Sequence, residues 1–162
     1  MKKYEFTGEV KVKFGVTLKR IRAIIDFGNV KKGEIGGFIE KEENLSHENS
    51  AWISGSARVS GDAEVSGDAK VSGDAWVSGN AWVSGSADYM LIGRIGSRFG
   101  FTTFFKNKNK GVSVSCGCFS GTLAEFRKKV KETHGIDTKC AKVYQAAADL
   151  AELQILGNEK AD

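Results

Sequence analysis

Residues 51–86 read AWISGS ARVSGD AEVSGD AKVSGD AWVSGN AWVSGS, and this stretch decides the fold. Each unit of six places an alanine two residues before an isoleucine or valine, so both point to one face of a strand. The variable residue between them points the other way. Ser-Gly followed by Asp, Asn or Ser then forms a corner, because glycine allows positive φ and the polar residues bond turn backbone. A period of six with one short strand and one corner predicts a parallel β-helix.

The unit Val59-Ser60-Gly61-Asp62-Ala63-Glu64 resembles the repeat of the hexapeptide-repeat, left-handed β-helix family, with Ser60 where that family more often has glycine. The resemblance is close over residues 51–86 and loose over 33–92. It implies three hexapeptides per coil, so that residues 18 positions apart stack on the outside. The stacked pairs are then Trp52 over Lys70, Arg58 over Trp76 and Glu64 over Trp82.

Three outward tryptophans are more apolar surface than a short monomer normally exposes. The sequence therefore predicts that Trp52, Trp76 and Trp82 are covered, either by a partner subunit or by the terminal segments, with ligand stacking as the alternative. The family resemblance implies a homotrimer, and we assign the three tryptophans to its interface.

The flanking segments have ordinary strand and helix periods. Val10, Val12 and Phe14 alternate with lysines, which predicts a half-buried strand over residues 4–14. After Asp88 the repeat stops, and the pattern predicts strands over 89–95, 99–106 and 112–118. A capping box at residues 122–125 then opens the first of two helices, and the second covers about 138–156.

The predicted fold class is mainly β, a short left-handed parallel β-helix with an N-terminal β cap and a small C-terminal α+β unit. Its domains are the cap over residues 1–32, the β-helix over 33–88 and a β-meander with two helices over 89–162.

Composition limits the cellular setting. The chain has 162 residues, no proline and three cysteines, and no apolar run approaches the length of a membrane span. Three cysteines do not form a disulfide framework, so a reducing cytoplasm is the expected compartment. No P-loop, dinucleotide fingerprint or serine elbow is present, and we expect no cofactor.

One segment of the sequence has a composition that favours anion binding. No acidic residue occurs between Asp88 and Glu125, while five lysines and arginines do. Hydroxyls and a helix start lie in the same window, and unpaired N–H groups at a helix start attract anions. The predicted site for an anion such as a nucleotide consists of Arg94, Ser97, Arg98, Thr102, Thr103, Lys106, Ser120, Gly121 and Thr122.

Catalysis and metal binding have weaker support. Hexapeptide-repeat acyltransferases use a histidine as base, but this repeat contains none, and His47 and His134 have no evident partner. Two distant histidines also argue against the zinc carbonic anhydrases of that family. A zinc site from Cys116, Cys118, His134 and Cys140 has suitable ligands but unsuitable spacing. We therefore predict neither catalytic residues nor a metal, and treat the cysteines as buried small hydrophobes.

The overall layout is similar to that of short bacteriophage and prophage proteins. The similarity lies in the lysine-rich start, the Gly-Gly-Phe-Ile entry at residues 36–39 and the Val-Ser-Cys-Gly-Cys-Phe segment at 114–119. It suggests a non-enzymatic homotrimer that sequesters an anionic small molecule, such as a nucleotide signal of host defence. The alternatives are a structural or protein-interaction trimer and, with less support, an acyltransferase. We expect no membrane partner, and nucleic acid is disfavoured by the acidic repeat.

Overall fold

The computed structural model describes the backbone of residues 1–160 and the side chains of residues 1–157. Over this range the chain forms thirteen strands in four small sheets, together with two α helices. The N-terminal strands are β1 (Tyr4–Lys13), β2 (Val16–Ala23) and β3 (Ile35–Ile39). The repeat gives β4 (Trp52–Ile53), β5 (Arg58–Val59), β6 (Glu64–Val65), β7 (Lys70–Val71), β8 (Trp76–Val77) and β9 (Trp82–Val83).

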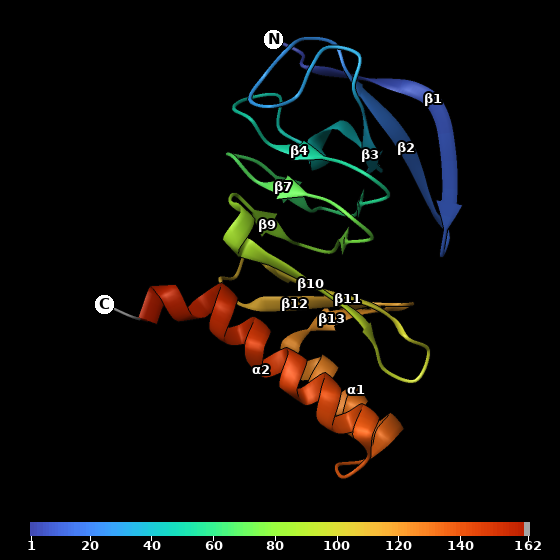
Figure 1. The fold of residues 1–162 in the computed structure, drawn as a ribbon, viewed down its shortest axis with the longest axis vertical. Helices are drawn as coiled ribbons and strands as arrows, with labels where there is room; N and C mark the ends of the chain where they lie inside the picture. The colour runs from blue at the N-terminus through green and yellow to red at the C-terminus, as the bar shows by residue number, and fades with distance from the viewer. Residues whose placement is uncertain (161–162) are drawn as a thin grey trace.

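The remainder is a sheet with two helices. Its strands are β10 (Tyr89–Ile95), β11 (Gly100–Lys106), β12 (Val112–Cys116) and β13 (Phe119–Thr122), and the helices are α1 (Leu123–His134) and α2 (Lys139–Lys160). Short 3-10 turns, η1 (Glu42–Asn44) and η2 (Ser86–Asp88), flank the repeat. In Figure 1 the repeat lies above this unit, and the β1–β2 hairpin runs down its side.

The predicted fold class, a mainly β protein built on a left-handed parallel β-helix, is wrong. The described strands belong to four separate small sheets, five of the nine strand pairings are antiparallel, and two helices complete a mixed fold. The physical reason is strand length. Each repeat unit contributes only two residues of strand, whereas the flanking segments supply strands of four to ten residues that pair antiparallel.

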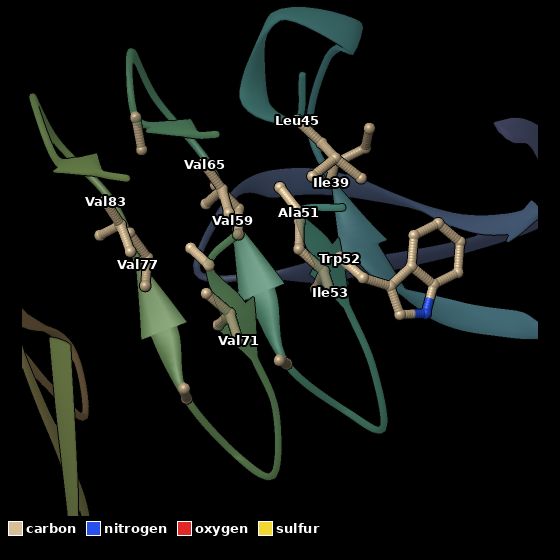
Figure 2. Close-up of a cluster of buried hydrophobic side chains, with 14 of the residues drawn as sticks. Ile39, Leu45, Ala51, Trp52, Ile53, Val59, Val65, Val71, Val77 and Val83 are labelled. Atoms are coloured by element: carbon tan, nitrogen blue, oxygen red, sulfur yellow. The ribbon is translucent and has the colours of Figure 1, made fainter. Parts of the chain in front are cut away.

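The 18-residue register is nevertheless confirmed. Trp52 pairs with Lys70, Arg58 with Trp76 and Glu64 with Trp82, all in parallel. β3 extends one of these ladders, because Phe38 pairs with Arg58. The inward alanines and valines are completely buried between the ladders, and Figure 2 shows the valines from successive strands lying against one another. Close packing of small side chains holds this part together.

The C-terminal sheet separates two hydrophobic cores. Phe105 packs into the core of the repeat, whereas its neighbour Phe104 packs against α1 and α2. The predicted strands are present, although the third ends at Cys116 because Gly117 turns the chain with φ of 58°. Both helices begin where the sequence indicated, and β13 is an additional edge strand.

The N-terminal hairpin departs from its prediction. Val10 and Val12 are 56% and 66% exposed, so these two valines face solvent, whereas Tyr4 and Phe6 earlier in β1 pack into the core. Lys11 and Arg20 instead turn inward and lie over the Phe38 ring, with 5.2 and 4.9 Å to its centroid. Cation–π contacts therefore add to the buried Leu18 and Ile21 of β2 in holding the hairpin to the β3–β5–β8 ladder.

Within the described part of the chain, neither helix combines the length and apolarity that crossing a membrane requires.

Candidate functional site

A pocket of about 200 Å³ forms where three distant parts of the chain meet. The tip of the β1–β2 hairpin, the β5–β8 ladder and the β12–β13 turn each supply one wall. We call it the Trp76 pocket, and its lining residues are Phe14, Val16, Ser60, Trp76, Ser78, Gly79, Ser115, Gly117, Cys118, Phe119 and Ser120. Because the three walls come from three segments, the pocket exists only in the folded chain.

The aromatic wall is built by the hairpin tip and the repeat. The rings of Phe14 and Trp76 are stacked, with 5.7 Å between centroids and 8° between planes. Trp76 is oriented at both ends: its Nε1–H donates to Ser60 Oγ at 2.9 Å, and its backbone N–H donates to Thr103 Oγ1 at 3.0 Å. The indole is therefore held rigidly where it lines the pocket.

Two cations flank the aromatic pair. Lys13 Nζ lies 5.6 Å from the Phe14 centroid, and Arg58 Cζ lies 4.8 Å from the Trp76 centroid. Arg58 donates from Nη2 to the Asp74 carbonyl at 3.3 Å, while its Nε is buried without a hydrogen-bond partner. Burial lowers the pKa of Arg58, and nearby Asp74 opposes that shift. Two cationic side chains therefore lie beside the aromatic pair, although neither belongs to the lining of the pocket.

The opposite wall carries hydroxyls. In β12, Val112 and Val114 face the helices, so the intervening Ser113 and Ser115 face the repeat and are buried. Ser120 on β13 pairs with Ser115, and its Oγ lies 3.5 Å from Ser78 Oγ. These hydroxyls can donate to or accept from a ligand.

The predicted anion-site residues do not form one site. Arg94, Ser97 and Arg98 are exposed at the β10–β11 turn, and the Arg94 guanidinium lies over Phe101 at 5.4 Å. Thr103 and Ser120 face the Trp76 pocket region, whereas Thr102 turns toward the helices.

Lys106 is half-buried at the far end of β11. Gly121 and Thr122 lead into α1, where the helix start is already capped. Glu125 Oε1 accepts from the Thr122 N–H at 3.0 Å, and Thr122 Oγ1 accepts from the Glu125 N–H at 3.2 Å. The Glu125 carboxylate therefore occupies the position that an anion would take at this helix start.

The three tryptophans differ in environment. Trp52 is buried within the protomer, with its ring edge-on to Phe27 at 5.3 Å. Trp76 is half-buried under Phe14, and Trp82 remains 43% exposed. Intrachain segments thus cover Trp52 fully and Trp76 in part, and Trp82 keeps the largest exposed surface of the three.

The cysteines do not gather into a metal site. Among the described residues, no group of three or more His, Cys, Asp or Glu side chains is placed to hold a metal ion. Cys116 Sγ accepts from Thr102 Oγ1 at 3.2 Å on the helix side of the sheet, whereas Cys118 is exposed at the rim of the Trp76 pocket. Tyr144 packs near Cys116 and Cys140, and burial, followed by Cys116, raises its pKa to about 12.

Sequence reasoning missed the role of Phe14 and of the β12 serines. The predicted stacking of Arg58 over Trp76 drew attention to Trp76, but no feature of the sequence indicated that the hairpin tip would reach it. Strict Val-Ser alternation in residues 112–115 was the available signal for a second, polar face.

No protein-family model matches this chain, and no curated protein is similar enough to count as a relative. The resemblance to hexapeptide-repeat and phage proteins therefore stays a prediction.

Proposed function

We propose that this protein is a non-enzymatic binding protein that holds a small, planar, anionic molecule of the nucleotide class in the Trp76 pocket. The observation that carries the proposal is the stacked Phe14–Trp76 pair flanked by Lys13 and Arg58. Aromatic faces favour a heterocyclic ring, and the neighbouring cations favour phosphate or carboxylate.

The size of the pocket limits what enters it. About 200 Å³ lies below the roughly 300–1,000 Å³ of sites that enclose drug-sized ligands. The pocket would therefore take one ring system, with the anionic part of the ligand at the mouth near Lys13 and Arg58. The serine hydroxyls on the opposite wall would recognise the edge of the ring.

The chemistry of the lining supports binding without turnover. The described lining residues include no histidine, carboxylate or lysine that could act as a general base, and the exposed Cys118 thiol at the rim has no such base beside it in the lining. A nucleotide signal of host defence, which the phage resemblance suggests, belongs to the ligand class we propose.

The test is ligand capture. The purified protein is incubated with a bacterial small-molecule extract, washed and heated, and the released molecules are identified by mass spectrometry. We expect one enriched aromatic anion, released chemically intact. Trp76→Ala should abolish the enrichment, and Lys13→Gln should weaken it roughly tenfold by removing one charge at the surface.

Trp82→Ala is the matched control, because it removes an indole of the same repeat that lies outside the pocket. Equal enrichment by the native chain and Trp76→Ala would overturn the assignment of the pocket. Release of a chemically altered molecule would overturn the non-enzymatic part.

A further inference from the structure

Phe14 occupies a position in the β1–β2 hairpin that rarely suits a bulky side chain. Lys13 and Val16 form the last pair of the hairpin, so Phe14 and Gly15 are its two turn residues, with φ of 48° and 77°. A turn with two positive φ values favours asparagine followed by glycine, because a bulky side chain is strained in the left-handed region. The chain keeps a phenylalanine here at a cost in stability, and such strain points to a role for the side chain.

The Phe14 ring covers one face of Trp76. The two rings are nearly parallel, with 5.7 Å between their centroids. Atoms in contact lie about 3.5–4 Å apart, so a third ring between these two would need a separation of about 7–8 Å. A planar ligand can therefore stack on this face of Trp76 only after Phe14 has moved away. Of the two side chains over the Trp76 ring, Arg58 is half-buried, whereas Phe14 is 59% exposed.

The segment that carries Phe14 buries little surface. We call residues 12–17 the hairpin tip; five of these six described residues are exposed, and Val16 is half-buried. A Cβ on Gly15 would meet nothing within 4 Å. Leu18 is the first fully buried residue after the turn. A segment with so little buried apolar surface opens locally at a low cost in free energy.

We propose that Phe14 is a lid on the Trp76 pocket: the hairpin tip closes the pocket, and it lifts before a ligand ring stacks on Trp76. The ligand ring then takes the place of the Phe14 ring, so the closed tip competes with the ligand and lowers its apparent affinity. Because the lid acts on the Trp76 pocket, it rests on the function proposed for that pocket and adds how the site is opened.

The test uses variants that keep the turn but differ in the ring. Phe14→Asn suits the left-handed turn and removes the ring, whereas Phe14→Tyr keeps the ring. Titration of the full chain with adenosine monophosphate and with uridine monophosphate, followed by nitrogen-15 NMR, gives the dissociation constants. We expect Phe14→Asn to bind at least one of the two at least about threefold more tightly than the native chain, and Phe14→Tyr to stay within about twofold of it. Phe99→Asn is the matched control, because Phe99 is exposed, has φ of 50° and lies outside the lining of the pocket.

A measurement without nucleotide separates the lid from the proposed function. Nitrogen-15 relaxation dispersion should show the Trp76 indole N–H and the amides of the hairpin tip exchanging at one common rate, and Phe14→Asn should remove the exchange at Trp76. A native chain without that exchange would overturn the lid. Equal or weaker nucleotide binding by Phe14→Asn would also overturn it, because Phe14 would then be dispensable or a wall of the site. If neither nucleotide binds the native chain or the variants while the exchange persists, the proposed function fails and the lid stands.

Discussion

The repeat segment and the C-terminal sheet both alternate side chains along their strands, yet they use the two faces differently. In the repeat, one face is filled by buried alanine and valine, while the other carries residues as different as Glu64 and Trp82. In β12 both faces are buried, with valines toward the helices and serines toward the repeat. A polar residue in the alternating pattern therefore faces solvent in the repeat, whereas in β12 it belongs to a buried polar face. That buried hydroxyl face is what makes the Trp76 pocket possible.

The two faces of the C-terminal sheet differ most clearly at β11, where adjacent phenylalanines enter different cores. Phe104→Ala and Phe105→Ala should each lower the free energy of unfolding by about 3–5 kcal/mol, because each truncates a fully buried ring. Hydrogen exchange should separate them: Phe104→Ala should accelerate exchange in α1 and α2, and Phe105→Ala in β8 and β9. Identical exchange patterns for the two variants would mean that the two cores are not distinct.

The next largest difference in stability is expected between alanine substitutions at two glycines that share one backbone conformation. Gly67 and Gly117 have φ of 59° and 58°. A Cβ on Gly67 would lie 2.3 Å from the Ser84 carbonyl oxygen, whereas a Cβ on Gly117 would meet nothing within 4 Å. Gly117→Ala should lower the free energy of unfolding by about 1–2 kcal/mol, through backbone strain alone.

Gly67→Ala should cost about 3 kcal/mol or more, because overpacking adds to that strain. Chemical denaturation of both variants measures the difference. If both variants lost the same free energy of unfolding, the stacked ladders would accommodate an added methyl group without strain. That result would contradict close packing of the ladders.

A smaller effect is expected at the start of α1. Thr122→Ala removes the acceptor for the Glu125 N–H and should lower the free energy of unfolding by about 1 kcal/mol. Thr122→Ser keeps that acceptor and should be nearly neutral. If removing the cap instead strengthened nucleotide binding, the helix start would have to be reconsidered as an anion site.

The N-terminal end of the chain and the two helices should also differ in how their stability responds to acid pH. His47 Nδ1 accepts from the Lys3 N–H at 3.2 Å, and its ring stacks on Tyr4 at 4.1 Å. Burial lowers the pKa of His47, so the unfolded chain takes up this proton first as pH falls. Stability at the N-terminal end should therefore decline as pH drops below about 6.5.

Hydrogen exchange at pH 7 and pH 5 measures this effect, with amides of α1 and α2 as the internal reference. His47→Gln should reduce the difference between the two pH values at the N-terminal end. An unchanged acid response in that variant would assign the effect to other groups.

The sequence predicted the secondary structure better than the arrangement of distant segments. The family resemblance, with three hexapeptides per coil, implied the 18-residue register. The capping box at residues 122–125 predicted the start of α1, because a helix cap depends on neighbouring residues alone. The fold class was wrong, because a period does not reveal how few residues each unit contributes to a strand. The orientation of Val10 and Val12 was also wrong, since alternation identifies two faces without saying which one is buried.

The candidate site was harder to predict for the same reason. Phe14 and Trp76 are 62 positions apart, and only the path of the hairpin brings their rings together. Arg94 and Thr103 are close in the sequence but lie at different places on the sheet.

Trp76, rather than Trp52 or Trp82, is the tryptophan that we propose contacts the ligand. The most direct measurement uses nitrogen-15 NMR of the three indole N–H groups during titration with adenosine monophosphate and uridine monophosphate. We expect the Trp76 signal to shift and saturate with at least one of the two nucleotides, while the signals of Trp52 and Trp82 remain in place. Saturable movement of the Trp82 signal alone, or of none of the three with either nucleotide, would contradict it.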